Sequence, residues 1–295
     1  MVACIRRMGR SMPFVHALAI AWVAAATACT DGRRDAPVRP VATPAPSSLR
    51  VVSLSPALTH SAIALGAAGS IVGRTPWCTA PDAVVVGSLT DRNLEAIAAL
   101  RPTLVLRQSG VPDAALEELC AALGARLYER HLNSLDDVRN MVRSLGEALE
   151  GAGCPGAAGA ASAALERHTA ELQHRAAAGP TLFLFSTDPP SAFGAGTFVD
   201  GLWSAMGGTN AIRAEGYPVL SAEDVVRLRP ARILLLGASA APAWLHAPGA
   251  ACPVPVATAL LEPSVAMLVD GPAILRAACD DRASGAPAVP EGAAP

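Results

Sequence analysis

Short apolar runs alternate with helical patterns along most of the chain. The runs "LRVVSL" (49–54) and "TLVLR" (103–107) are mostly apolar, as expected of buried strands. Ser55-Pro56 fits the cap and first position of a helix, and Asn93 fits the cap of another. Strands that alternate with helices predict an α/β fold, with mostly parallel sheets flanked by helices. Further predicted elements in this half are strands at 70–73, 83–87 and 125–130 and helices at 112–124 and 134–151.

The alternation stops at an alanine-rich segment and then begins again. This segment is a single helical pattern that ends at Gly179-Pro180, and at 1.5 Å per residue it would run roughly 33 Å. The sequence therefore predicts two lobes bridged by a single long α-helix: an N-terminal lobe at 50–155, the connecting helix at 156–179 and a C-terminal lobe at 180–283. Predicted elements of the second lobe are strands at 181–185, 231–236 and 254–259 and helices at 197–208, 221–230 and 271–281.

Two stretches, one in each lobe, read almost alike. "LEAIAALRPTLVL" and "AEDVVRLRPARILLL" each contain Glu, then Arg-Pro, then an apolar run. Asn93 and Ser221 are good N-caps, which puts Glu95 and Glu223 in the first turn of equivalent helices. An acid there commonly does no more than gain about 0.3–1 kcal/mol from the helix dipole. Because the position matches in both lobes, we also expect one exposed carboxylate per lobe on the same side of a bilobed body.

The first 28 residues read as a signal peptide. Basic residues precede an apolar stretch of about 18 residues, which is marginal for a membrane span and ends in small residues at Cys29. "ATAC" resembles a bacterial lipobox with Ala26 where Leu is usual, so the alternatives are a lipidated Cys29 and plain secretion. Either outcome places the mature chain in the periplasm or another extracytoplasmic space. Two segments lack a core-forming pattern, a Pro/Ala/Ser-rich tether at 29–49 and a tail at 284–295.

Composition narrows the function classes. The 295 residues are 52% hydrophobic and 16% charged with a formal net charge of −2, so the chain is globular and has no electrostatic footprint for nucleic acid. All 23 basic residues are Arg, which removes the Schiff-base and P-loop chemistries that need a lysine. Cys252 with Cys279 is the best disulfide pair, but the connectivity stays open. The cysteines beyond Cys29, which show no C-x-x-C spacing, are Cys78, Cys120, Cys154, Cys252 and Cys279.

The Ser-Pro helix start, "IVG" and "NLEAIAALRPTLVL" resemble the N-terminal lobe of periplasmic substrate-binding proteins for iron-siderophores, haem and vitamin B12. "TFVDGLWSAMGGTNAI", "GYPVLSAEDVVRLRP" and "DGPAIL" match the same family, so the likeness covers about residues 50–282. The "NLE" and "DPP…FGAG" regions are most similar to cobalamin-binding members. The resemblance implies a ligand held between two lobes, and a glutamate on each lobe that docks onto the permease dimer of an ABC importer. By motif position these are Glu95 and Glu223.

Ligand-binding residues are expected on the loops that follow the strand ends. Cobalamin or another corrinoid is the favoured ligand, with a ferric siderophore or haem as alternatives. Trp77 and Tyr217 would lie flat against a planar chelate or be partly buried at a lobe edge, and Tyr217 would be the axial ligand of a haem. An anionic siderophore would need Arg74, Arg92 and Arg107, although each is expected to be a solvated surface residue. The candidate ligand-binding residues are Ser55, Pro76, Trp77, Leu89, Gln108, Phe193 and Tyr217.

Other function classes have weaker support in the sequence. A bare metal ion would need convergent ligands, whereas His60 and His131 are scattered and expected to be structural. Cys78 with a distant histidine would suit an enzyme, but G-x-S-x-G and H-E-x-x-H motifs are absent, so we expect no catalytic residues. A periplasmic sensor on the same fold is a third alternative. We expect a monomer without a cofactor of its own that captures a metal chelate and delivers it to an ABC importer.

Overall fold

The computed structural model describes residues 48–88, 91–110, 112–174, 176, 178–237, 241–246, 253–256 and 258–280. The chain divides into two units, Met1–Ala45 and Pro46–Pro295, and every described residue lies in the second. The predicted signal peptide, the lipidation site Cys29, the ligand candidate Leu89 and the cysteine Cys252 lie outside the described residues.

The first lobe is built on a five-stranded sheet in the order β3-β2-β1-β4-β5, and every neighbouring pair is parallel. Its strands occupy the short apolar runs that the sequence predicts, and the inner strands β1 and β4 are the most deeply buried, as expected of near-continuous apolar runs. The strands are β1 (Val51–Ser53), β2 (Ile71–Arg74), β3 (Val84–Val85), β4 (Leu104–Gln108) and β5 (Arg126–Arg130).

Polar side chains start the helices around this sheet, as predicted. The Ser55 and Asn93 side chains accept backbone N–H groups at the helix starts, and Ser134 forms a capping box with Asp137. Each bond gives an acceptor to an N–H group that has no partner inside its helix. The helices are α1 (Pro56–Ala62), which continues through the π-helix η1 (Ile63–Ala67) and the 3-10 helix η2 (Ala68–Ser70), α2 (Leu94–Ala99), α3 (Ala114–Leu123) and α4 (Leu135–Gly151).

The second lobe contains another five-stranded sheet. Its order is β10-β9-β6-β7 with β8 paired to β6, and only the β6–β7 pair is antiparallel. None of the helices in the described part of the chain is long and apolar enough to cross a membrane. The strands are β6 (Pro180–Thr187), β7 (Pro190–Ala192), β8 (Thr209–Asn210), β9 (Arg232–Leu236) and β10 (Pro253–Val256), and the helices are α5 (Ala157–Glu171), α6 (Phe198–Ala205), α7 (Ala222–Leu228), η3 (Ala243–His246), η4 (Thr258–Leu261) and α8 (Val265–Asp280).

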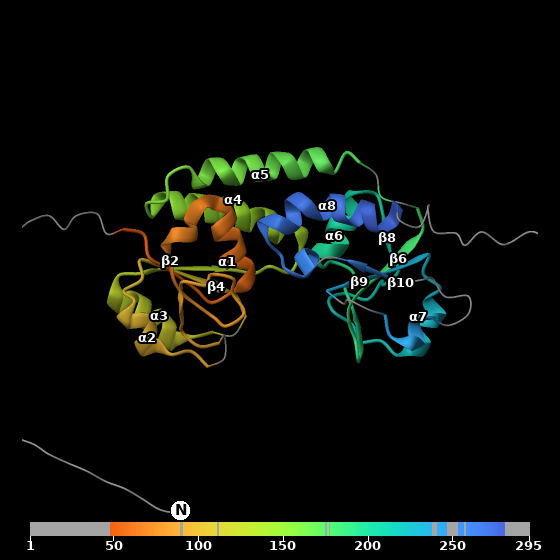
Figure 1. Cartoon of the computed structure of the whole chain (residues 1–295), viewed down its shortest axis with the longest axis horizontal. Helices are drawn as coiled ribbons and strands as arrows, with labels where there is room; N and C mark the ends of the chain where they lie inside the picture. The colour runs from red at the N-terminus through yellow and green to blue at the C-terminus, as the bar shows by residue number, and fades with distance from the viewer. Residues whose placement is uncertain are drawn as a thin grey trace, which may run out of the picture. The chain divides into compact units, whose positions relative to one another are not determined.

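The connecting helix is shorter than the predicted span 156–179. It is α5, which ends at Glu171, and beyond it the N–H of Ala176 donates to the carbonyl of Met206 at 2.8 Å instead of continuing the helix. Helix α4 also passes between the lobes. It packs against α1 of the first lobe, against α6 and α8 of the second lobe, and along α5. Two adjacent helices therefore join the lobes (Figure 1).

Helix α8 begins at Val265 rather than at the predicted Gly271, so Pro272 lies inside the helix instead of at its start. A proline there leaves the carbonyl four residues earlier, that of Leu268, without its helical N–H partner. The buried ring of His168 on α5 supplies the missing donor, since its Nδ1 lies 2.8 Å from the Leu268 carbonyl oxygen. A side chain of α5 therefore supplies the hydrogen bond that α8 lacks at Leu268. No local sequence pattern predicts this contact.

Stability is expected to fall as the pH drops below about 6.5, because His168 is held neutral in the folded chain. Its Nδ1 donates to Leu268, and its Nε2 accepts from Nε of Arg139 at 3.2 Å. Burial lowers the pKa of His168 below its usual 6.5; the bond to Leu268 opposes that shift and the Arg139 guanidinium adds to it. Below 6.5 the unfolded chain takes up a proton that the folded chain does not. The free energy of unfolding then decreases by at most about 1.4 kcal/mol per pH unit.

The matched variant is His168→Gln, which replaces the imidazole with a neutral amide that can still donate and accept hydrogen bonds, and so removes this titration. Urea denaturation of both proteins between about pH 5 and pH 7 measures the slope. We expect a shallower pH dependence in the variant. Equal slopes would show that His168 is not the group responsible.

Alternate residues of the central strands enter different apolar clusters. Leu104 and Leu106 of β4 join the largest cluster, called here the shared core, whereas Val105 joins a separate cluster with residues of α2 and α3. In the second sheet Phe183 of β6 joins the shared core, and Leu182 joins a cluster with α7. Because successive side chains of a strand point to opposite faces, α2 and α7 cover the sheet faces away from the shared core. Figure 1 shows α2 and α7 on that side of their sheets.

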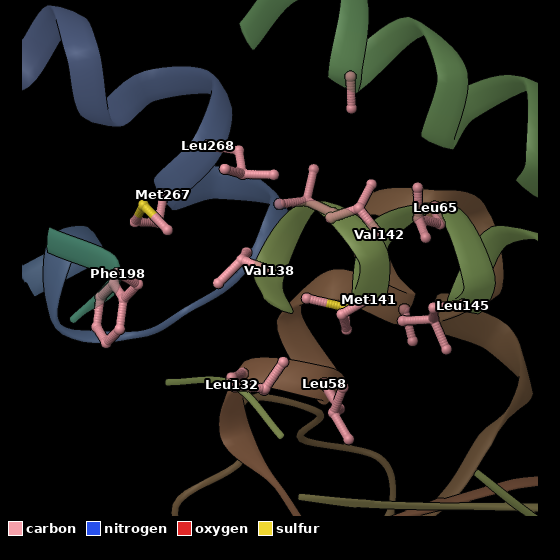
Figure 2. Close-up of a cluster of buried hydrophobic side chains, with 14 of the residues drawn as sticks. Leu58, Leu65, Leu132, Val138, Met141, Val142, Leu145, Phe198, Met267 and Leu268 are labelled. Atoms are coloured by element: carbon pink, nitrogen blue, oxygen red, sulfur yellow. The ribbon is translucent and has the colours of Figure 1, made fainter. Parts of the chain in front are cut away.

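The shared core joins the two lobes. It contains residues of both sheets and of α1, α4, α5, α6 and α8. Figure 2 shows Leu268 of α8 and Phe198 of α6 around Val138 of α4, while Leu58 of α1 lies beside Met141 on another side of α4. Pulling the lobes apart would expose this apolar surface at a cost of about 25 cal/mol per Å². Large separation of the lobes is therefore unfavourable.

Close packing of α4 against α5 depends on Gly146. A Cβ atom at this position would lie 2.6 Å from Cβ of Ala161 and 2.9 Å from the carbonyl oxygen of Ala157. We expect Gly146→Ala to lower the free energy of unfolding by about 1–2 kcal/mol, since overpacking outweighs the gain in helix propensity. Gly159→Ala is the matched control in α5, where an added Cβ meets nothing within 4 Å and should be neutral or stabilising. Thermal melts compare the two; equal effects would contradict the close approach.

Candidate functional site

A cavity of about 340 Å³ lies between the two lobes. Its lining comes from α1, the end of β4 and the loop after β5 in the first lobe, and from β6, α6 and the segments before α7 and α8 in the second. The central strands of both sheets reach it near their carboxyl ends, which is where open α/β sheets hold their ligands. The lining residues are Pro56, Ala57, Gln108, Leu132, Phe185, Phe193, Phe198, Tyr217, Leu261, Glu262 and Pro263.

Four aromatic rings of the second lobe form one wall of the cavity. The ring centroid of Phe193 lies 5.0 Å from that of Phe185, 5.4 Å from that of Phe198 and 5.6 Å from that of Tyr217, always edge to face. Each such pair is worth about 0.5–1.5 kcal/mol beyond its burial, so the rings fix one another. Phe193 and Phe198 are buried, whereas Tyr217 is 45% exposed. Burial raises the pKa of Tyr217 above its usual 10, so its side chain is a neutral phenol.

The wall from the first lobe is smaller and mostly apolar. Pro56 and Ala57 belong to α1, and Leu132 lies on the loop between β5 and α4. Gln108, the last residue of β4, supplies the amide of this wall, and the Ser55 hydroxyl donates to its Oε1 at 3.5 Å. Ser55 therefore has two contacts, since it also caps α1. The site combines an aromatic wall, an apolar wall and a few polar groups.

A carboxylate lines the cavity from the segment between η4 and α8. Glu262 belongs to this segment, and its Oε2 accepts a hydrogen bond from Nδ1 of His60 on α1. Both side chains are about one third exposed, at 34% and 32%. The contact joins the two lobes at the edge of the cavity.

Three of the predicted ligand-binding residues meet in this cavity. Gln108 comes from the first lobe and Phe193 and Tyr217 from the second, so the strand-end argument brings residues of both lobes together. Ser55 lies behind Gln108 and contacts it. A role of these residues in ligand binding stays a prediction.

The remaining candidates lie elsewhere. Pro76 and Trp77 follow β2, are not among the residues that line this cavity, and are exposed, Trp77 at 65%. Leu89 lies outside the described residues.

Sequence reasoning missed several lining residues. Phe185 had a usable signal, because it ends the predicted strand 181–185 at the carboxyl edge where ligands bind. Phe198 is the first residue of α6, where an aromatic side chain would be predicted to belong to the hydrophobic core rather than to a binding site. Leu132 and Glu262 lie on connecting segments with no motif, and only the tertiary arrangement brings them to the cavity.

The three arginines considered for an anionic ligand have partners away from this cavity. Arg107 is buried rather than solvated, which corrects the prediction: its Nε donates to Glu129 at 2.8 Å, and the Asp113 carboxylate lies 3.7 Å from Nη1. Arg92 pairs with the same Asp113, and Arg74 donates to backbone oxygens of its own loop. A buried guanidinium requires such acids, since an unpaired buried charge is costly.

The repeated phrases fold into the same local structure. Glu95 and Glu223 are exposed in the first turns of α2 and α7, and Glu223 pairs with Arg227 at 3.0 Å. Each helix is followed by an arginine with positive φ, 44° at Arg101 and 43° at Arg229, and no other non-glycine residue in the described ranges has one. Docking by the two glutamates stays a prediction, and its requirement for exposed acids is met.

The structure gives the scattered histidines and cysteines other surroundings. The described residues contain no group of three or more His, Cys, Asp or Glu placed to hold a metal ion. His131 is exposed. Cys78 is buried, with its Sγ 3.1 Å from the Thr75 hydroxyl and 3.8 Å from a backbone carbonyl of β1. Cys252 lies outside the described residues, so its pairing with Cys279 stays a prediction.

A family model for periplasmic binding proteins matches residues 51–243, which is more than half of the chain. The protein therefore belongs to the periplasmic binding protein family and is a periplasmic solute-binding protein. The Vitamin B12-binding protein of Yersinia pestis (strain Pestoides F) is 29% identical to it over 205 residues, covering 66% of this chain and 71% of the relative.

Solved structures share the fold at low sequence identity. The periplasmic vitamin B12-binding protein BtuF of Vibrio cholerae has a TM-score of 0.61 at 22% identity, covering 78% of this chain and 97% of that one. A periplasmic haem-binding protein from Pseudomonas aeruginosa has a TM-score of 0.58 at 22% identity, covering 78% and 91%. The molybdate-binding protein MolA of Haemophilus influenzae has a TM-score of 0.63 at 16% identity, covering 80% and 88%. These likenesses show the two-lobed fold, and their ligands differ widely.

Proposed function

We propose that this protein captures a corrinoid, cobalamin or a close relative, in the cavity between its lobes and delivers it to an ABC importer. The observation that carries the proposal is the wall of four aromatic rings, three of which pack around Phe193, opposite an apolar wall with one amide, Gln108. A large ring system with amide side chains suits a site of apolar surfaces and few polar groups. The relative from Yersinia pestis, which is named as a vitamin B12-binding protein, supports the same ligand class.

The size of the cavity bears on how such a ligand would sit. Its 340 Å³ is at the lower end of small-molecule sites, which span about 300–1,000 Å³. A corrinoid is larger, so part of the chelate would extend beyond the cavity. Pro76 and Trp77, exposed on the loop after β2, remain the candidates for contacts with that part.

Haem and anionic siderophores have less support. Burial raises the pKa of Tyr217, which opposes the phenolate that would ligate ferric iron. Haem propionates and many siderophores are anionic, yet no arginine is among the described residues that line the cavity. The geometry therefore favours a chelate that requires neither a phenolate ligand nor a basic pocket.

The remaining parts of the proposal concern delivery. A signal peptide at 1–28 would export the chain, and lipidation at Cys29 would tether the monomer to the membrane beside its permease. Glu95 and Glu223 would dock the loaded receptor. We propose that the protein acts by binding alone, without a catalytic residue or a resident cofactor.

The experiment that tests the ligand class is native mass spectrometry of the mature protein with cyanocobalamin, haemin and ferric enterobactin. We expect a one-to-one complex with cyanocobalamin and none of comparable stability with the other two. Binding of haemin or ferric enterobactin in place of cyanocobalamin would reject the corrinoid proposal.

A further inference from the structure

The described lining of the cavity holds one carboxylate, Glu262, and no arginine or histidine. Lysine is absent from the entire chain. The other polar groups of the lining are the amide of Gln108 and the neutral phenol of Tyr217. A ligand in the cavity therefore meets a negative charge without a cation beside it in the lining.

The position of Glu262 is fixed by two hydrogen bonds between the lobes. Nδ1 of His60 on α1 donates to its carboxylate. The next residue of α1, Ser61, accepts the backbone N–H of Val265 through its hydroxyl at 3.2 Å, in a buried contact. Val265 is the first residue of α8. The segment 262–265 is thus held against α1 at both ends, which keeps the carboxylate at the cavity.

We propose that Glu262 is a specificity-determining residue that selects bound chelates by charge, admitting neutral and cationic ones and excluding anionic ones. The inference rests on the proposed role of the protein as a chelate receptor. Binding would bring an anionic group close to a carboxylate that is only one third exposed and is therefore incompletely screened by water. Like charges brought together in this way oppose binding, which is how a site rejects a competitor. His60 is a positioning residue, because it acts through Glu262.

The test uses two metal-free porphyrins of similar size and opposite charge, tetrakis(N-methylpyridyl)porphyrin and tetrakis(sulfonatophenyl)porphyrin, with cyanocobalamin as the neutral probe. We expect the parent protein to bind the cationic porphyrin at least about tenfold more tightly than the anionic one. Glu262→Gln keeps the shape of the side chain and should bring this ratio close to one. The Kd for cyanocobalamin should change by no more than about twofold, since this probe carries no net charge.

Two further variants distinguish an effect of the Glu262 carboxylate from a general effect of removing a negative charge. Glu147→Gln removes an exposed acid of α4 outside the cavity lining and should leave the porphyrin ratio unchanged. His60→Ala should lower the ratio without altering the Kd for cyanocobalamin, which a purely structural role would not predict. Thermal melts check that each variant is folded.

The outcomes distinguish this inference from the function on which it rests. An unchanged porphyrin ratio in Glu262→Gln, or an equal loss for all three probes, would overturn charge selection. If the ratio behaves as expected but cyanocobalamin does not bind, the corrinoid proposal fails and charge selection stands. If none of the probes binds the parent protein, both proposals are rejected.

Discussion

Replacing Glu95 and Glu223 together with alanine is expected to abolish uptake through the importer while leaving ligand affinity unchanged. The two acids are exposed on α2 and α7, on the sheet faces away from the shared core. Truncating one partner of a charge pair that is hydrogen-bonded and buried at an interface costs about 2–5 kcal/mol, so the loss of two such pairs with the permease should reduce transport at least about hundredfold. Opening the Glu223–Arg227 pair for docking costs little, because exposed ion pairs are worth at most about 1 kcal/mol. Uptake into proteoliposomes that contain the permease and its ATPase measures the effect.

The matched control removes two exposed acids elsewhere. Glu147 lies on α4 and Glu166 on α5, and both belong to the helices that join the lobes. The double variant Glu147→Ala with Glu166→Ala changes the net charge equally and should transport normally. Normal uptake by the Glu95/Glu223 variant would rule out their docking role.

Truncation of Tyr217 to alanine is expected to weaken ligand binding about thirtyfold, the effect of losing about 2 kcal/mol. The ring forms part of the aromatic wall and is 45% exposed, so its loss should affect affinity more than stability. Isothermal titration with cyanocobalamin measures the change.

Two neighbouring variants sharpen this prediction. Tyr217→Phe keeps the ring and should bind a corrinoid nearly as well as the parent, whereas a haem held through the phenol oxygen would be lost. Val219→Ala truncates an exposed side chain outside the cavity lining and should have no effect. An unchanged Kd in Tyr217→Ala would show that the ligand does not use the aromatic wall.

Local patterns were sufficient to predict most of the fold. Most strands of both sheets lie in the predicted apolar runs, although β7 and β8 were not predicted, and Ser55, Asn93 and Ser134 cap helices as expected. These features depend on near neighbours in the sequence, so they can be predicted without a structure. The start of α8 is different, because Pro272 is tolerated inside the helix only where His168 satisfies the carbonyl of Leu268.

The residues of the candidate site also differ in whether local sequence patterns could predict them. Gln108, Phe193 and Tyr217 follow from the rule that loops after strand ends face the ligand, and all three line the cavity. Glu262 could not be predicted, because its place depends on contacts between α1 and the start of α8, which are far apart in the sequence. Arg107 was misjudged for the same reason, since its burial depends on acids from the cap of α3 and from β5.

Hydrogen–deuterium exchange of the mature protein with and without cyanocobalamin tests whether the ligand binds between the lobes. If the ligand lies between the lobes, binding should slow exchange in peptides from both walls of the cavity and leave α2 and α7 unchanged. Protection confined to one lobe, or to surfaces outside the cavity, would show that the ligand does not bind between the lobes. The segments expected to gain protection are 55–60, 106–110, 183–187, 192–198, 214–218 and 260–264.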